Sequence, residues 1–377
     1  NVKSDVFASN INLDFINYKK PSNARGNLTG TFFFSGNKIT KINNLNFFTD
    51  NIIMKGSLYF DDDLKIKKIK LGEYIYEKNN FSAIITYSKN DSRIITVDGT
   101  SIDLINFIKS NSKKLNNTIF SLNIEKLFYG DKFLGKGSLN VKTKNSLLES
   151  IEGKLFYNSK PYVYFNDIPF GEIKYKKILF KVDDLGMFLK ETKLSESFIK
   201  GNGDVFIILD KEKLNIHSGN INISDSSVKN ASFLARLLQL ASFTGLLEIL
   251  TNEGIPFNKI EGDFSVNNKV VNINNLKFKG FSLGGTVKGS INLSNELIDL
   301  EGVIVPAYAI NSLINKIPIV GQIITGIEGE GLIGVNYKAR GTIDKPNYNI
   351  NPLSILTPGI IRNVFDVFKA DESEITK

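Results

Sequence analysis

The chain has 377 residues, more than one ordinary hydrophobic core needs, so we expect several domains or one repeating architecture. Hydrophobic residues make up 42% and charged residues 23% of the sequence, which is ordinary for a folded protein and argues against global disorder. The absence of cysteine excludes disulfides, thiolate nucleophiles and cysteine-ligated metals. The formal charge of +8 is compatible with a phosphate-bearing partner, but lysines that wet the outer face of strands also account for it.

Alternation of apolar and polar residues with a period of two dominates from Ile11 to about Ile223, with turn residues about every ten positions. Similar phrases recur at Met54–Leu58, Gly135–Leu139 and Val287–Ile291. An apolar-Glu-Gly phrase also recurs, ending at Gly153, Gly262, Gly302 and Gly329. The spacing is irregular, so the pattern indicates one hairpin unit repeated along a single growing sheet rather than a strict solenoid.

The one long helical pattern predicts a helix from Ala231 to Leu250, which Gly254 and Pro256 end. Apolar residues cover most of its circumference, so it needs a large hydrophobic surface to pack against. Two shorter helices are predicted near the end of the chain, an apolar one over residues 308–317 and an amphipathic one over residues 358–369.

These patterns divide the chain into four predicted regions. Residues 1–223 form a repeating β region, and residues 224–257 form an apolar helix that plugs or flanks it. The β region continues over residues 258–350, with the short helix at 308–317, and residues 351–377 form the amphipathic helix and a polar tail. No run reaches the roughly 18 uncharged apolar residues that a membrane span needs, so an anchor, if there is one, is expected upstream of Asn1.

The sequence contains few motifs that indicate a catalytic or ligand-binding site. His217, the one histidine, lies in an alternating strand and is interpreted as a solvated strand residue. Asp61–Asp63 is interpreted as a surface turn rather than a cation site. Gly329–Gly334 matches the dinucleotide fingerprint but runs into a strand instead of a helix, which argues against a nucleotide. The basic runs at 65–70 and 174–181 mix lysine with apolar residues as half-buried strands do, so no nucleic acid is expected. From the other motifs, no cofactor and no metal are expected either.

Several stretches after the middle of the chain resemble the C-terminal region of the bacterial AsmA-like proteins, the YhdP branch in particular. They are Leu234–Phe257, Gly302–Asn311, Ile317–Gly321, Gly329–Gly331 and Asn351–Gly359, followed by Arg362. Val97–Leu104 and Asp183–Gly186 fit the same branch more loosely. The resemblance is at the level of motifs from Leu234 onward and at the level of pattern over the whole chain.

The resemblance implies a mainly β fold, an elongated and twisted antiparallel sheet curled into a hydrophobic groove, with a few apolar or amphipathic helices near the C-terminal end. It also implies a protein without catalytic residues that carries phospholipid across the periplasm of a Gram-negative bacterium, between the inner and outer membranes. We therefore expect phospholipids and both membranes as partners and no cofactor, with further envelope proteins left open. The expected location is the periplasm, with an anchor in the inner membrane.

On this interpretation, alternating apolar residues line the groove. The candidate lining residues are Met54, Leu58, Phe60, Phe81, Ile85, Phe120, Leu122, Ile124, Val205, Ile207, Val271, Ile273, Val287, Ile291, Ile333, Val335 and Tyr337. The candidate membrane- or groove-facing helix residues are Phe233, Leu234, Leu237, Leu238, Leu246, Leu247, Ile361, Val364, Phe365 and Phe368. Any lining residue is equally compatible with ordinary core packing.

Two other functions stay open. A structural or adhesive β-solenoid of the cell envelope would show the same alternation around a closed core. An enzyme with an unrecognised carboxylate site is the third candidate, although one histidine and no cysteine leave it little material. Charged substitutions at lining positions separate the first two, because they block lipid passage in an open groove but unfold a closed core.

Overall fold

The structure, a computed structural model, describes residues 1–13, 18–88, 92–105, 117–158, 160–241, 243–306, 335–343 and 345–351. The chain forms two compact units. Unit 1 comprises Asn1–Ile178 and Asp210–Leu214, and unit 2 comprises Leu179–Leu209 and Asn215–Lys377. In both units the described strands form an open, twisted and mainly antiparallel sheet, and twenty strands take part in it.

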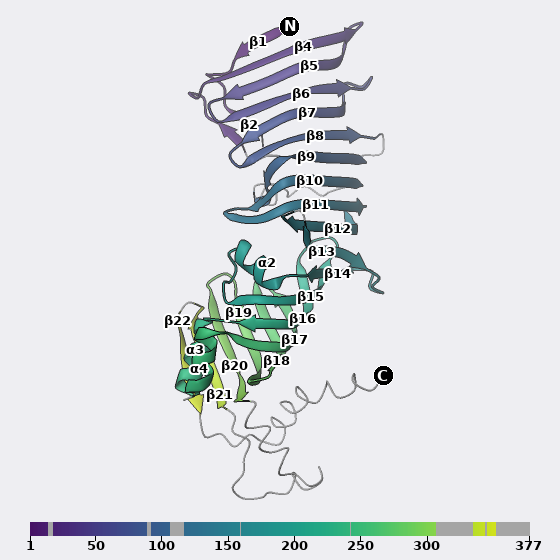
Figure 1. Ribbon diagram of the computed structural model, residues 1–377. Coiled ribbons are helices and arrows are strands. Elements are labelled where there is room, and N and C mark those ends of the chain that lie inside the picture. The colour runs from purple at the N-terminus through teal and green to yellow at the C-terminus, as the bar shows by residue number, and fades with distance from the viewer. Residues whose placement is uncertain are drawn as a thin grey trace, which may run out of the picture. The chain divides into compact units, whose positions relative to one another are not determined.

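Unit 1 consists of successive strands, visible as a ladder from purple to teal in Figure 1. The strands are β1 (Val2–Asp5), β2 (Ile11–Leu13), β3 (Tyr18–Lys20), β4 (Gly26–Ser35), β5 (Lys38–Thr49), β6 (Ile52–Phe60), β7 (Ile66–Tyr76), β8 (Asn79–Tyr87), β9 (Arg93–Asp103), β10 (Thr118–Tyr129), β11 (Lys132–Lys144), β12 (Leu147–Tyr157), β13 (Lys160–Ile168) and β14 (Tyr175–Val182), whose last residues belong to unit 2. From β4 to β13, each strand pairs with the next one in sequence.

These pairings are antiparallel except between β9 and β10, which run parallel. The antiparallel pairs follow from short hairpins such as Asn145-Ser146, which lies between the paired residues Lys144 and Leu147. Both turn residues have positive φ, 51° and 64°, as the type I′ turn of a two-residue hairpin requires. Asparagine tolerates this conformation better than most residues do, which explains the Asn-rich turns of the sequence.

A small hairpin of β2 and β3 packs at the N-terminal end of unit 1. The Tyr18 ring contacts Phe47 and Tyr76 edge-on, with centroid distances of 6.2 and 5.3 Å. The buried Lys20 ammonium donates hydrogen bonds to the carbonyl oxygens of Phe7, Ser9 and Pro21 at 3.3, 2.9 and 3.0 Å. These three acceptors replace the water that the ammonium loses on burial.

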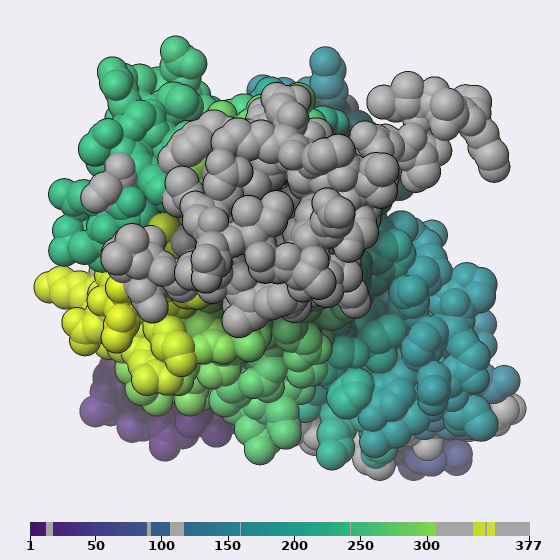
Figure 2. Space-filling view, turned by 90° about the horizontal axis from the view of Figure 1, so that it is seen from below, coloured from purple at the N-terminus to yellow at the C-terminus, as the bar shows by residue number. Residues whose placement is uncertain are grey.

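In its described residues, unit 2 combines a sheet with three short helices. Its elements are α2 (Leu185–Glu191), β15 (Phe198–Asp210), β16 (Ile216–Val228), α3 (Ser232–Leu240), α4 (Thr244–Asn252), β17 (Ile255–Asn267), β18 (Val270–Gly280), β19 (Leu283–Asn292), β20 (Leu297–Pro306), β21 (Val335–Thr342) and β22 (Lys345–Asn351). From β15 to β22, each described strand pairs antiparallel with the next. Figure 2 shows β21 and β22, in yellow, directly beside the green strands of this sheet.

The helices α3 and α4 lie against the sheet of unit 2 (Figure 1). Leu237, Leu238 and Leu250 are at most 1% exposed and join Ile255 and Ile304 in one hydrophobic cluster. Because both helices are apolar over much of their surface, this burial is the main source of their stability.

The prediction of a mainly β fold with an open antiparallel sheet is confirmed. The prediction of one helix over Ala231–Leu250 is wrong in detail, because α3 ends at Leu240 and α4 begins at Thr244. Thr244 and Gly245 are poor helix formers, and the break lets both helices pack on the curved sheet. The sequence pattern does not predict α2. This helix is only seven residues long and begins after Asp184, whose side chain accepts a hydrogen bond from the Met187 N–H.

Candidate functional site

An unbroken row of large apolar side chains crosses unit 1 from β4 to β12. Strand register places its members opposite one another, one residue from each strand. They are Phe32, Ile42, Leu58, Ile69, Ile85, Ile95, Phe120, Val141 and Ile151, which we call the apolar row. Every member is half-buried. Eight inter-strand spacings of about 4.8 Å give the row a length of about 38 Å.

We call the face of the sheet that carries the apolar row the inner face. Two rows of paired residues away from the apolar row, the side chains of this face are more deeply buried. There the register joins Phe47, Met54, Tyr74, Phe81, Gly99, Ile124, Gly137, Leu155 and Val163. Phe81 is 6% exposed and Ile124 is fully buried. The row between them contains Leu122, which is 3% exposed. The side chains of the inner face are therefore buried along one side and partly accessible to solvent along the apolar row.

The opposite, outer face of the same sheet is mainly polar. Lys55 pairs with Glu73 at 2.6 Å and Lys136 with Glu125 at 2.8 Å, both between exposed side chains. Such exposed pairs contribute little to stability, and their main effect is to keep this face of the sheet hydrated. Exposed apolar exceptions on the outer face include Ile84, Ile94 and Ile119, which are 40%, 52% and 46% exposed. Each directly precedes a member of the apolar row, so adjacent residues of one strand lie on opposite faces of the sheet.

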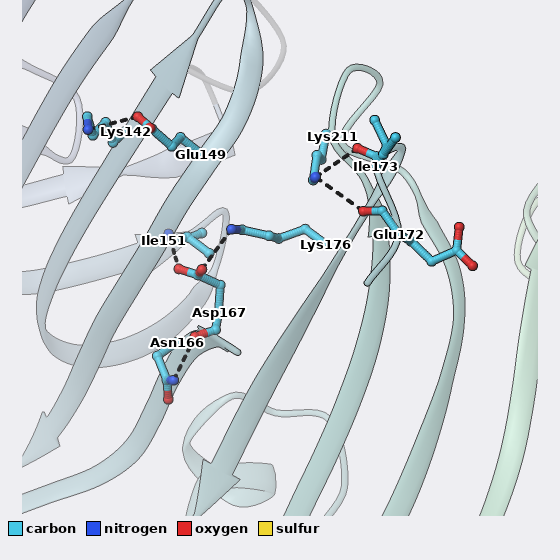
Figure 3. Close-up of polar contacts among 9 residues, drawn as sticks. All are labelled: Lys142, Glu149, Ile151, Asn166, Asp167, Glu172, Ile173, Lys176 and Lys211. Carbon is cyan, nitrogen blue, oxygen red and sulfur yellow. Dashed lines mark hydrogen bonds and ion pairs between the residues drawn. The ribbon is translucent and has the colours of Figure 1, made fainter. Parts of the chain in front are cut away.

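A charged pair lies at the end of the apolar row (Figure 3). The Asp167 Oδ2 atom lies 2.8 Å from the Lys176 Nζ atom, with the side chains 22% and 18% exposed. The Asp167 Oδ1 atom accepts a hydrogen bond of 2.8 Å from the N–H of Ile151, the last member of the row. Burial alone would raise the pKa of Asp167, but the Lys176 ammonium and the Ile151 N–H outweigh it and hold that pKa below its ordinary value.

In unit 2 the helices divide the apolar face of the sheet. Leu238 and Leu246 cover the part that contains Leu283, Ile304 and Val335. Beside this part, Ile298, Leu300 and Ala339 form a second cluster, against which half-buried side chains pack. Phe233 of α3 contacts both clusters, and its ring lies 6.0 Å from Tyr337 and 5.6 Å from Tyr348.

The predicted lining residues of unit 1 share the inner face. Leu58, Ile85 and Phe120 are members of the apolar row. Met54, Phe81, Leu122 and Ile124 lie in the more buried neighbouring rows, and Phe60 lies opposite Ile66 at the end of its strand.

The remaining predicted residues fall into three groups. Val205, Ile207, Val271, Ile273, Val287 and Ile291 are half-buried in unit 2, whereas Val335 and Tyr337 are buried beneath the helices. Phe233, Leu234, Leu237, Leu238, Leu246 and Leu247 all belong to the cluster between helices and sheet. Ile333, Ile361, Val364, Phe365 and Phe368, and the predicted helices over 308–317 and 358–369, lie outside the described residues.

Several members of the apolar row are absent from the candidates that the sequence offers. They are Phe32, Ile42, Ile69, Ile95, Val141 and Ile151. A β-bulge between Ile42 and Leu45 puts residues three apart on the same face, and another does so between Leu71 and Tyr74. Strict alternation therefore fails there. The only signal in the sequence is the apolar character of each residue, since pairing between strands decides which of them line up.

The described ranges contain no cluster of metal ligands and no membrane-spanning helix. Among them, no group of three His, Asp or Glu side chains is arranged to hold a metal ion. No helix in the same ranges has the length and apolar character that a membrane span requires. The candidate site is thus the apolar row with the Asp167–Lys176 pair at its Ile151 end.

Comparison with known proteins gives one match. Residues 209–348, which lie mostly in unit 2, match the family model described as YhdP protein. No curated protein and no solved structure matches the chain. The matched segment includes α3, α4 and the strands that they cover, which is where the motif-level resemblance begins.

Proposed function

We propose that this chain, which belongs to the YhdP family through residues 209–348, binds phospholipid along the apolar row and conducts it between membranes. Family membership and the large open sheet are consistent with a lipid transport protein. The choice of phospholipid as cargo, and of the apolar row as its path, is our proposal. We further propose that the path lies in the periplasm, between the inner and outer membranes.

The observation that carries this proposal is the unbroken, half-buried apolar row. Moving one methylene group from hydrocarbon into water costs about 0.8 kcal/mol, so an unaided lipid faces a barrier of roughly ten kcal/mol or more. A surface that shelters the acyl chains removes most of that cost without any chemical step. The acyl chains of one leaflet span about 15 Å, half of the ~30 Å hydrocarbon core, so a row of about 38 Å exceeds their length. A lipid can therefore slide along the row without leaving it.

The polar outer face supports the same conclusion. A sheet that buried apolar residues equally on both sides would be the centre of a solid core. In unit 1, one face carries paired lysines and glutamates, and the apolar face is accessible along one row. A transport path needs this asymmetry, because one face of the sheet must shelter the acyl tails while the other face keeps the sheet hydrated.

The test uses adjacent residues with opposite orientations. Ile95→Asp puts a carboxylate into the apolar row, whereas Ile94→Asp puts the same group on the outer face, where Ile94 is 52% exposed. Binding of a phospholipid with a fluorescent acyl chain is measured for the full chain, together with its circular dichroism. We expect Ile95→Asp to lose binding and keep its strand signal, and Ile94→Asp to match the unmodified chain.

The closed-core alternative predicts a different pair of results. Ile95→Asp would then unfold unit 1, and the unmodified chain would not bind the lipid. The milder variant Ile95→Thr keeps the branching at Cβ and the β propensity of the position. Folded Ile95→Thr with undiminished lipid binding would contradict the proposed path.

A further inference from the structure

A second row of side chains, this one polar, runs parallel to the apolar row on the inner face. Tyr87, Arg93, Thr118 and Thr143 lie opposite one another on β8, β9, β10 and β11, and we call them the polar row. Each residue is two positions away from a member of the apolar row on its own strand. Two residues of a β-strand span about 6.6 Å, so the rows are separated by about that distance.

The guanidinium group of Arg93 is held in place through its Nε atom. This atom donates a hydrogen bond of 3.0 Å to the Thr118 Oγ1 atom. The Thr118 N–H in turn donates to the Thr143 Oγ1 atom at 3.1 Å, and both threonines are buried. These bonds fix the direction of the guanidinium group, and they leave the donors of its two terminal nitrogens to other partners.

Arg93 also lacks a counter-charge in the part of the chain that the structure describes. No carboxylate there forms an ion pair with it, although many lysines of the sheet have such a partner. Lys176, at the end of the apolar row, is paired with Asp167, and Lys20 is surrounded by carbonyl oxygens. Among the described residues, Arg93 is thus a cation beside the apolar row that no carboxylate neutralises.

The chemistry of its donors favours a phosphate. A guanidinium group presents parallel N–H donors that match the oxygens of a phosphate, and such charge-assisted bonds are stronger than neutral ones. Tyr87, across the strand pair from Arg93, adds a hydroxyl group on the same side. In a phospholipid, the phosphate is joined to the acyl chains by a short glycerol linker, which is compatible with the spacing of the two rows.

We infer that Arg93, with Tyr87 and Thr118 beside it, binds the phosphate of a phospholipid whose acyl chains lie on the apolar row. This inference rests on the proposed function, because it assigns the headgroup position on the same path. Binding of the phosphate at this site slows the movement of the lipid along the apolar row and orients its headgroup. A lipid without phosphate then has the same apolar contacts but lacks the charged one.

The experiment compares two ligands with identical acyl chains, phosphatidylglycerol and diacylglycerol, each carrying a fluorescent label on one tail. The full chain is titrated with both. We expect about tenfold tighter binding of phosphatidylglycerol, as one charge-assisted contact can provide. Arg93→Gln should abolish this preference and leave diacylglycerol binding unchanged. Arg93→Lys keeps the charge but loses the paired donors, so it should retain only part of the preference.

A matched control removes one positive charge from the outer face of the same sheet. Lys68 lies opposite Thr86, which lies opposite Ile94, so Lys68→Gln changes the net charge equally but on the other side of the sheet. It should keep the tenfold preference. If Lys68→Gln weakens phosphatidylglycerol binding as much as Arg93→Gln does, the effect comes from net charge and the site is contradicted.

The outcomes for the two proposals differ. Equal binding of both ligands by the unmodified chain, or an unchanged preference in Arg93→Gln, would overturn the phosphate site but leave the apolar row as a lipid path. Failure of the unmodified chain to bind either ligand would overturn both. Inorganic phosphate serves as competitor, and displacement of the lipid at equal concentration would assign the site to free phosphate instead.

Discussion

Asp167 and Lys176 form an ion pair of 2.8 Å on the inner face of unit 1, where the apolar row ends (Figure 3). The pairing of β12 with β13 begins at Glu152 and Asn166, so the N–H of Ile151 has no partner in that ladder. The Asp167 carboxylate accepts this N–H instead and holds Lys176 beside it. The pair therefore both closes the end of the hydrogen-bond ladder and replaces apolar surface with charge.

Removal of the charge of Asp167 should destabilise unit 1. Asp167→Asn should lower the free energy of unfolding by about 1 kcal/mol, because an amide can still accept the Ile151 N–H but leaves Lys176 without this counter-charge, and solvent screens part of the effect. Urea unfolding followed by circular dichroism measures the change. Asp131→Asn is the control, since Asp131 is 97% exposed in its pair with Lys78 and should show no measurable change. Equal effects of the two substitutions would contradict a stabilising role for the Asp167–Lys176 pair.

The contribution of the same pair should depend on pH. The pKa of Asp167 is lowered in the folded chain, so its stabilising contribution is present above the unfolded value of about 3.9 and is lost as the pH falls through the folded value. The stability difference between the unmodified chain and Asp167→Asn should therefore shrink below about pH 4. Unfolding midpoints measured across this range test it. A difference that stays constant down to about pH 2 would argue against a charged Asp167.

Gly153 on the inner face should not tolerate a side chain. A Cβ atom at this position would collide with the Phe165 ring, which lies over it from the next strand, and with the Ser138 carbonyl oxygen. Gly153→Ala should cost about 1–3 kcal/mol of stability through overpacking. Gly72→Ala is the control, because its Cβ atom would lie 3.7 Å from the Lys55 carbonyl oxygen, an ordinary contact. Thermal unfolding of both variants checks the difference, and a tolerated Gly153→Ala would refute this packing.

The helices of unit 2 give a prediction about burial. Leu238 is fully buried between α3 and the sheet, whereas Leu240 is 38% exposed. Leu238→Ala should cost about 2–5 kcal/mol of stability and Leu240→Ala much less, as their burial dictates. Urea unfolding of the two variants measures this. Similar, small effects of both substitutions would mean that α3 is not packed on the sheet as described.

The sequence predicts some features of this fold because they are local. The apolar-Glu-Gly phrase is one example. Gly153 lies opposite Phe165, Gly262 opposite Leu276 and Gly302 opposite Tyr337, so each of these glycines faces a large side chain on the next strand. The phrase therefore encodes a packing unit, with the apolar residue and the glycine inward and the glutamate outward. For this reason its recurrence indicates repeated hairpins of one sheet.

Other features depend on contacts between distant residues and could not be predicted. Alternation identifies Ile85 as facing the opposite way from Ile84, but it cannot reveal that Ile85 pairs with Ile69 and Ile95. The surroundings of Arg93 are similarly invisible in the sequence, since they depend on which carboxylates the fold brings near. The break between α3 and α4 is hidden in the sequence by the apolar pattern on both sides of it, although the poor helix formers Thr244 and Gly245 follow it.

Site-specific photo-crosslinking of the full chain to lipid tests most directly whether phospholipid lies on the apolar row. A photo-reactive phenylalanine derivative is placed at Ile42, Ile95 and Ile151 along the row, and at Ile84 and Ile94 on the outer face. Each variant is irradiated with vesicles of phosphatidylethanolamine and phosphatidylglycerol, and adducts are identified by mass spectrometry. We predict phospholipid adducts at all three row positions and none at the two outer positions. Absence of adducts along the row, or equal labelling of both faces, would contradict a lipid path on the inner face.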